Sequence, residues 1–422
     1  MSGAPQRFGE VRSVARDPMQ DAHIVRALGE EFLVWDAFVS GYPRVGLTPL
    51  VLSADTHRDA VHAAETVARA AHAAGEAALG DAREAARYGL HPEMQALARA
   101  SWEAGDTRGL SRVDLLFGED GAFHACEVNA DCPGGHNETV ALPRLARRAG
   151  VTGLHDPTIM MDALVDELLA LAGGPGCPRG AIVLTYATAY AEDLQVCAFL
   201  ERALRARQAR VYRAPITTLC PRAGDDGTRG LQLRGVDVAV LYRYFPLEYM
   251  EGLRTVPAFV AAVRAGTLRT LSSFSHIYAQ SKASLVHMCE HTPYVPATYP
   301  LQFPETRDLV QNRGEWVVKR ALGRVGDEVF VGPLHSKAEW AEVVRDTTER
   351  AARGETWLAQ RFVHQRTVPT PHGPRFVTLG AYVQNGAFTG YFARLTEVSH
   401  ATHDALVVPV FVDHARASGG LA

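Results

Sequence analysis

The sequence has few of the patterns that identify zinc, redox or nucleic-acid-binding proteins. Its 422 residues include six cysteines, with no Cys-x-x-Cys pair and no zinc-type spacing to the 17 histidines. We therefore expect scattered, reduced thiols, which are typical of a cytoplasmic protein. The formal net charge of -4 does not favour nucleic acid or an anionic membrane surface as a partner.

Long apolar stretches are also missing. No run approaches the ~18 apolar residues that a membrane-spanning helix needs, and the first residues, MSGAPQR, lack the apolar core of a signal peptide. With 47% hydrophobic and 21% charged residues, the composition is that of a globular protein. We expect a soluble, cytoplasmic protein of two or three domains, without a membrane partner. The sequence allows a homodimer but does not indicate one.

The most informative pattern is a pair of alternating segments joined by Asp120-Gly121. Asp-Gly between such segments is typical of a hairpin with a two-residue turn. This turn would place Asp114 opposite Glu127. It would also place Arg112 opposite Asn129, with all four side chains on one face. Facing carboxylates repel each other, whereas a cation between them would make a site. Carboxylate and amide oxygens suit magnesium bound together with substrate phosphates. The alternative is a solvated outer face of a hairpin.

A turn-rich loop follows this hairpin and reads Cys-Pro-Gly-Gly-His from Cys132 onward. Loops at the end of a rigid strand are common places for substrate contacts. Gly134, Gly135 and His136 are therefore candidate substrate residues, and a plain connecting loop is the alternative.

The sequence pattern in the middle of the chain predicts a small parallel sheet. Residues 173–178 are the best candidate linker. Beyond it, strands are expected at 181–186, 209–212 and 236–242, with an amphipathic helix at 192–207. This succession favours parallel strands with right-handed crossovers. No Gly-x-Gly-x-x-Gly follows the first of these strands, so a dinucleotide site is not expected there.

The last third of the chain supplies lysines and glycines that suit a phosphate group. Lys282 opens a predicted helix, and Lys319 ends a short predicted strand. Gly323 and Gly326 follow that strand, and two glycines three apart suit a turn whose backbone amides cover phosphates. Taken singly, each lysine could equally be a surface residue.

Two more polar residues lie on predicted strands. Gln360 lies on one strand, and Asn385-Gly386 joins two others, at about 375–384 and 387–395, in a second tight hairpin. The later strand carries Arg394 on an apolar background. Together, the lysines, glycine turn, acidic face and arginines form a phosphoryl-transfer set, without a Walker loop or a kinase His-Arg-Asp loop.

These motifs, from about residue 110 to 395, resemble those of the glutathionylspermidine synthase family in the family's order. They are the metal motif Arg112-x-Asp114 with Glu127-x-Asn129-Ala-Asp131-x-Pro133, the segment 242–248, the lysine segment Ser281-Lys282-Ala283, and Lys319 with Gly323-Arg324. The resemblance implies an α/β (α+β) fold, namely an ATP-grasp fold in circularly permuted order. Permutation would explain why the metal acids precede the nucleotide lysines.

The resemblance also implies a domain plan. Residues 1–175 would form an N-terminal region with the metal-binding hairpin. Residues 176–268 would form a small α/β, pre-ATP-grasp-like domain with the parallel sheet. Residues 269–422 would supply the ATP-binding lid and complete the central sheet of the ATP-grasp core.

By the same resemblance, the cofactors are ATP and Mg²⁺, and each candidate residue has an expected role. The metal ligands would be Asp114, Glu127 and Asn129, and the catalytic arginines would be Arg112 and Arg394. ATP would be contacted by Lys282, Lys319, Gly323, Gly326 and Gln360. The substrate would be contacted by Gly134, Gly135, His136 and Glu248. The implied reaction is phosphorylation of a small-molecule carboxylate, followed by attack of an amine to give an amide and ADP. The alternatives are a small-molecule kinase and a degenerate nucleotide-binding partner protein without turnover.

Three departures from the family pattern stand out. Arg320 follows Lys319 where proline is frequent in the family. Asp327-Glu328 places acids beside the proposed phosphate loop, where they would oppose phosphate unless turned outward. The Cys-Pro-Gly-Gly loop replaces a Ser/Thr-rich stretch, so the fold and ATP chemistry transfer better than the identity of the substrates.

Overall fold

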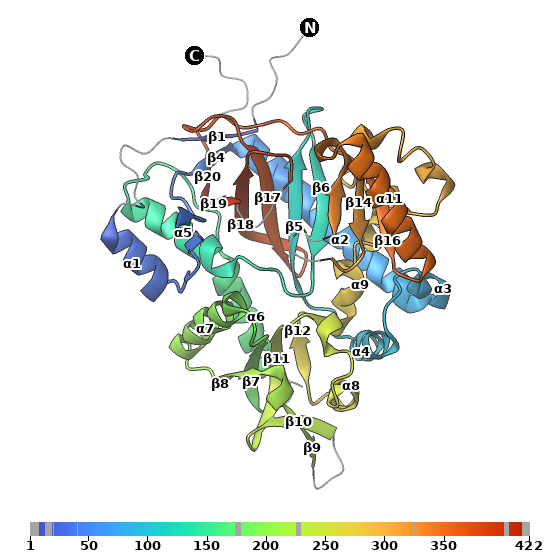
Figure 1. Cartoon of the computed structure of the whole chain (residues 1–422). Coiled ribbons are helices and arrows are strands. Elements are labelled where there is room, and N and C mark those ends of the chain that lie inside the picture. Colours follow the sequence, from blue (N-terminus) through green and yellow to red (C-terminus); the bar gives the residue numbers. More distant parts are fainter. Residues whose placement is uncertain are drawn as a thin grey trace.

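The computed structural model describes residues 8–12, 19, 21–39, 41–173, 179–224, 229–323, 326, 328–400 and 405–415. The chain forms a central antiparallel sheet with a smaller, largely parallel sheet below it and a four-stranded sheet beside it (Figure 1). The described ends of the chain lie close together, since strand β1 (Glu10–Val11) and strand β20 (Val410–Asp413) both pair with β4 (Leu50–Ser53).

The central sheet joins two distant parts of the chain. Its strand order is β19 (Leu406–Val408), β18 (Ala387–Thr396), β17 (Phe376–Gln384), β5 (Leu110–Phe117) and β6 (Phe123–Asn129). β17 pairs with β5, so the early hairpin becomes part of a sheet made by the last part of the chain. This pairing carries the candidate site.

One long helix covers the back of the central sheet. Helix α2 (Ala54–Gly80) runs behind it (Figure 1) and begins at Ser53, whose hydroxyl accepts a hydrogen bond from the Thr56 amide. Its buried residues are mostly alanines, which favour the helix and allow close approach to the strands. The cavity face of the sheet is therefore the opposite one.

The small sheet confirms the parallel order predicted from the middle of the chain. Strands β8 (Val211–Pro215), β7 (Ala181–Tyr186), β11 (Val236–Tyr244) and β12 (Arg269–Leu271) pair in parallel. An antiparallel extension, β10 (Arg229–Leu233) and β9 (Cys220–Ala223), was not predicted. The remaining helices around this region are α3 (Ala82–Ala86), α4 (Pro92–Glu103), α5 (His136–Arg148), α6 (Met160–Gly173), α7 (Ala191–Ala206) and α8 (Val256–Arg264).

The third sheet lies beside the central sheet under α11 (Lys337–Ala352) (Figure 1). Its order is β13 (Thr298–Pro300), β16 (Trp357–Arg361), β14 (Trp316–Arg320) and β15 (Val329–Val331). A capping box is present at the start of α11, where the Ser336 and Glu339 side chains each accept a hydrogen bond from the other residue's backbone amide. The other elements are α1 (Ala22–Glu30), β2 (Phe38–Val39), β3 (Tyr42–Pro43), α9 (Ile277–Gln280) and α10 (Ser284–His291), with short 3₁₀ turns between them.

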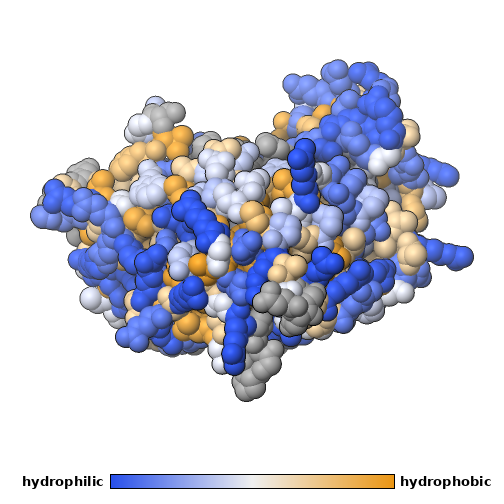
Figure 2. All heavy atoms as spheres, turned by 90° about the horizontal axis from the view of Figure 1, so that it is seen from below, coloured by the Kyte–Doolittle hydropathy of each residue, from blue (hydrophilic) through white to orange (hydrophobic). Residues whose placement is uncertain are grey.

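The surface seen from below is mainly hydrophilic, with apolar residues scattered over it (Figure 2). Scattered apolar residues are normal on a protein surface and need no partner. In the part of the chain that the structure describes, no helix combines the length and the apolar character required to cross a bilayer.

Candidate active site

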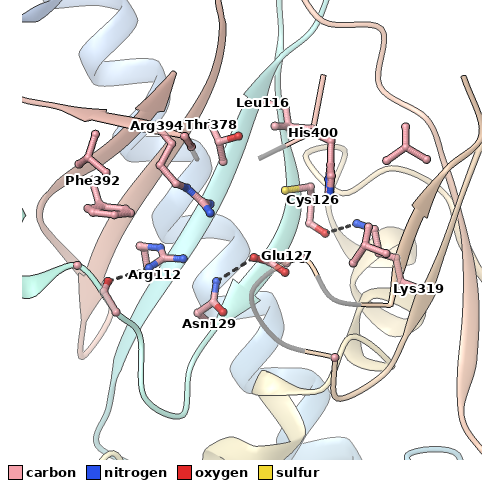
Figure 3. Close-up of a pocket in the computed structure, with 18 of the residues that line it drawn as sticks. Arg112, Leu116, Cys126, Glu127, Asn129, Lys319, Thr378, Phe392, Arg394 and His400 are labelled. Carbon is pink, nitrogen blue, oxygen red and sulfur yellow. Dashed lines mark hydrogen bonds between the residues drawn. The ribbon is translucent and has the colours of Figure 1, made fainter. Parts of the chain in front are cut away.

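A cavity of about 610 Å³ lies where the three large sheets meet. The central sheet contributes residues of β5, β6 and β18, the four-stranded sheet contributes residues of β14, β15 and β16, and the small sheet contributes Tyr244 at the end of β11. Figure 3 shows the middle of this cavity, where charged side chains from β5, β6, β14 and β18 gather. A pocket of this size suits a nucleotide or a drug-sized ligand.

The β5–β6 hairpin has the predicted pairing at the end of the strands away from the connecting loop. Asp114 pairs with Glu127, and Arg112 pairs with Asn129. Cross-strand partners point to the same face of a sheet, so all four side chains are on the cavity side. The pairing of these residues is confirmed.

The predicted two-residue turn at Asp120-Gly121 is wrong. The loop is longer and is closed by a 2.9 Å hydrogen bond from the Gly118 amide to the Ala122 carbonyl. The register shifts by one residue next to Asp114, where Cys126 is the extra residue on β6. This bulge compensates for the longer loop and restores the pairing beyond it.

Asp114 binds both arginines of the site. Its Oδ1 accepts from Arg112 Nε at 2.7 Å, and its Oδ2 accepts from Arg112 Nη2 at 3.0 Å and from Arg394 Nη2 at 2.6 Å. The Asp114 side chain is fully buried and, unlike Arg112 and Arg394, does not line the cavity. Burial opposes the charge on Arg112, but Asp114 outweighs it and raises the pKa of the guanidinium.

Glu127 and Asn129 line the cavity directly, as Figure 3 shows. Asn129 Nδ2 donates to Glu127 Oε1 at 3.2 Å. Burial disfavours the Glu127 carboxylate, but the charges of Lys282, Arg394 and Lys319 outweigh it and hold its pKa well below the usual range. Glu127 is therefore ionised at neutral pH and available to a cation.

The two lysines reach the site from different sides. Lys319 lines the cavity, and its Nζ donates to Gln360 Oε1 at 2.7 Å and to the Cys126 carbonyl at 2.9 Å. Lys282 Nζ donates to the Gly323 carbonyl at 2.7 Å and lies 3.4 Å from Glu127 Oε2. Burial lowers the pKa of Lys319. Lys282 is thus in contact with Glu127 but is not among the residues that line the cavity.

The glycine turn after β14 forms part of the cavity wall. Gly323 and Gly326 both line it, whereas the Arg324, Val325 and Asp327 positions lie outside the described residues. Glu328, which was expected to oppose phosphate unless turned outward, accepts from Arg320 at 2.9 Å and from Arg350 at 2.5 Å. Its charge is neutralised by these two arginines.

The candidate substrate residues divide into two groups. Gly134 and Gly135 line the cavity. His136 is fully buried, shares a 2.9 Å hydrogen bond with the Tyr242 hydroxyl and is not part of the lining. Glu248 is also outside the lining, although its neighbours Pro246 and Tyr249 belong to it. Direct substrate contact by His136 or Glu248 stays a prediction.

The end of the cavity away from Lys319 is acidic and was missed from the sequence. Arg44 pairs with Asp36 Oδ2 at 2.6 Å and with Glu138 Oε1 at 2.5 Å. Glu192 and Asp193 line the same end. These residues come from separate elements and follow no common spacing, so no sequence pattern could have assembled them.

Cys126, His400 and Phe392 also line the cavity and were missed (Figure 3). The position of Phe392 could have been predicted from the sequence, because it precedes Arg394 by two residues on one predicted strand. The two side chains therefore share a face. Burial raises the pKa of the Cys126 thiol to about 12, so this cysteine is not a nucleophile at neutral pH.

Comparison with known proteins identifies the family. The family model described as glutathionylspermidine synthase preATP-grasp matches residues 50–413. The chain belongs to this family. The resemblance inferred from the motifs is thereby confirmed, and so is the ATP-grasp fold with its permuted order of elements.

One solved structure supports this fold assignment. A glutathione synthetase-like effector from Globodera pallida superposes with a TM-score of 0.58 at 12% identity, covering 94% of this chain and 98% of that chain. A putative gamma-glutamylcysteine synthetase from Methylobacillus flagellatus has 13% identity and a TM-score of 0.39, covering 74% of this chain and 81% of that one. A sequence search of curated proteins finds no match.

The cavity residues suit a nucleotide that binds as its magnesium complex. Arg394 Nε is buried without a hydrogen-bond partner in the described part of the chain, as expected of a donor that faces an anionic ligand. Within the same described ranges, no group of three His, Cys, Asp or Glu residues could hold a metal alone. Magnesium commonly binds through one or two carboxylates plus substrate phosphates, and Glu127 with Asn129 offers such a partial set.

Proposed function

We propose that this protein is an ATP- and magnesium-dependent ligase that joins a carboxylate to an amine through an acyl phosphate. The observation that carries the proposal is the convergence of Lys319, Arg112 and Arg394 on one cavity that also presents the ionised Glu127. Membership of the glutathionylspermidine synthase family supports the same class of ATP-grasp ligase.

Lysine and glycine residues would hold the nucleotide. Lys319 would exchange its bonds to Gln360 and the Cys126 carbonyl for bonds to phosphate oxygens, and Gly323 and Gly326 would lie beside the phosphates. Lys282 acts from outside the cavity lining by keeping Glu127 ionised. Bound magnesium would neutralise charge on the phosphates.

The arginine pair would stabilise the transferred phosphoryl group. Arg112 and Arg394 are already fixed by Asp114, so their remaining N–H groups need little reorganisation when negative charge develops. Glu127 and Asn129 would bind the metal directly. Asp114 would have to move into the cavity to do so, because its side chain is fully buried beneath Arg112 and Arg394 and is absent from the lining.

The acidic end of the cavity favours ligation over simple phosphorylation. Glu192 and Asp193 line this end together with Asp36 and Glu138, which both pair with Arg44. Burial and the neighbouring Asp36 raise the pKa of Glu192 to about 7, and Asp36, Glu138 and Asp193 supply the negative charge. Negative side chains attract a cationic amine and repel a second anion. We therefore assign the amine to this end, with the carboxylate between it and the arginines.

ADP release tests this function. Purified protein would be given Mg-ATP and a panel of carboxylate–amine pairs, and ADP and condensation products would be measured. We expect at least one pair to stimulate ADP release and yield an amide. Lys319→Met should lower turnover by roughly a thousandfold, as loss of a buried phosphate-binding charge would, whereas Lys337→Met, at an exposed helix start, should not change it.

Two results would contradict the proposal. One is the absence of both Mg-ATP binding and ADP release with every pair. The other is a stable phosphorylated product without condensation, which would favour the kinase alternative.

A further inference from the structure

One row of residues crosses the central sheet beside the arginine pair. Asp114 on β5 pairs with Gly380 on β17, and Gly380 pairs with Phe392 on β18. Cross-strand neighbours point to the same face of a sheet, so a carboxylate, a gap and an aromatic ring follow one another on the cavity face.

Phe392 lies against both guanidinium groups. Arg112 Cζ is 5.2 Å from the ring centroid, and Arg394 Cζ is 5.9 Å from it. Both distances are within the range of a cation–π contact, and Figure 3 shows the ring beside the two arginines. Phe392 is 7% exposed, so solvent screens these contacts only weakly.

Gly380 leaves the space through which Arg112 reaches the ring. A Cβ atom at this position would lie 2.7 Å from Arg112 Cδ and 2.9 Å from the Phe392 carbonyl oxygen. Gly380 is not among the residues with positive φ, so backbone conformation does not require a glycine here. The lack of a side chain is what matters.

A second glycine packs against the Phe392 ring itself. Gly135 has φ +92°, and a Cβ atom there would lie 2.5 Å from Phe392 Cδ2. The neighbouring Gly134 carbonyl accepts from Arg112 Nη1 at 2.8 Å. The loop that lines the cavity therefore holds both the ring and the guanidinium.

We propose that Phe392 is a positioning residue for the arginine pair and that Gly380 provides the gap this arrangement needs. The inference rests on the proposed function, in which Arg112 and Arg394 hold the transferred phosphoryl group. Asp114 fixes the two guanidinium groups from one side and Phe392 fixes them from another. Their N–H groups then keep one orientation in the absence of ligand, which is the condition for stabilising developing charge without reorganisation.

The test compares binding of Mg-ADP alone with binding of Mg-ADP plus aluminium fluoride, a mimic of the transferring phosphoryl group, by isothermal titration. In the wild type, aluminium fluoride should tighten ADP binding. Phe392→Leu keeps an apolar side chain but removes the ring face, and should reduce this gain roughly tenfold, the order of a desolvated cation–π contact. Mg-ADP affinity should stay within about twofold, because nucleotide contacts elsewhere are intact.

Three further variants complete the test. Phe392→Tyr keeps the ring, so aluminium fluoride should still tighten its ADP binding as in the wild type. Gly380→Ala should lose this tightening, because the added Cβ displaces Arg112. Phe388→Leu is the matched control, because Phe388 is on the same strand but contacts His57 and Tyr391 instead. In turnover assays the Phe392→Leu defect should appear in kcat and leave KM for ATP nearly unchanged.

The outcomes separate this inference from the proposed function. If the wild type binds Mg-ADP and gains from aluminium fluoride, an unchanged gain in Phe392→Leu or Gly380→Ala overturns the inference alone. If the wild type binds neither form, the proposed function fails, and the inference fails with it. An equal loss in Phe388→Leu would also contradict a specific role of Phe392.

Discussion

Asp114 and Glu127 pair across β5 and β6, but of these two carboxylates only Glu127 lines the cavity. Asp114 is fully buried and accepts hydrogen bonds from Arg112 and Arg394. Glu127 is surrounded by lysine and arginine charges that keep it ionised. One cross-strand pair therefore supplies an anchor for the arginines and an acid that faces the cavity.

Replacing Asp114 by asparagine should lower the free energy of unfolding by roughly 3–5 kcal/mol, because it leaves buried guanidinium groups without their counter-ion. Urea denaturation would measure the change. Asp120→Asn is the control: this residue is 59% exposed in its side chain, so its ion pair with His124 contributes little. If Asp114→Asn and Asp120→Asn are equally stable, Asp114 is not the anchor described above.

Gly135→Ala should destabilise the protein more than Gly150→Ala. Both glycines have φ near +100°, which alone costs about 1–3 kcal/mol for alanine. Only Gly135 also lies against the Phe392 ring, whereas a Cβ at Gly150 would meet no atom within 4 Å. We expect a further loss of about 1–3 kcal/mol at Gly135 from this overpacking. Equal losses in thermal or urea unfolding would show that the ring and loop are not in contact.

The ionisation of the buried Asp106 should lower the free energy of unfolding as pH rises. Burial raises the pKa of its carboxyl to about 6, although hydrogen bonds from the Thr270 amide and hydroxyl favour the charged form. The folded state then binds a proton more tightly than the unfolded state, so this stability is full below about pH 4 and lost as pH passes 6. Asp106→Asn should therefore gain on the order of 2 kcal/mol over wild type between pH 4 and pH 8. A constant difference across this range would contradict the raised pKa.

The β5–β6 hairpin shows both the strength and the limit of prediction from the sequence. The pairing of Asp114 with Glu127 was predicted from a two-residue turn and is present, and strand alternation placed both side chains on one face. The turn was wrong, and the bulge at Cys126 restored the pairing. Local turn signals do not report a bulge, since its cause is the fit of the strand to its neighbours.

Lys282, Lys319, Arg112 and Arg394 were singled out because each lies on a short motif or a predicted strand. How deeply each one lies relative to the cavity was not predicted. Lys319 lines the cavity and Lys282 does not, a difference that depends on the fold of 271–291 against β6. The acidic end around Arg44 and Asp36 could not be predicted, since its residues come from α1's loop, α5 and α7 without a shared pattern. Packing between segments that are distant in the sequence determines which residues come together in such a group.

The acyl-phosphate step can be followed with a carboxylate substrate labelled with oxygen-18. In the proposed reaction, a carboxylate oxygen attacks the γ-phosphorus of ATP, and the amine later displaces phosphate from the acyl carbon. The released phosphate should then carry one labelled oxygen, and mass spectrometry should show the matching amide. Unlabelled phosphate formed alongside the amide would contradict the acyl phosphate.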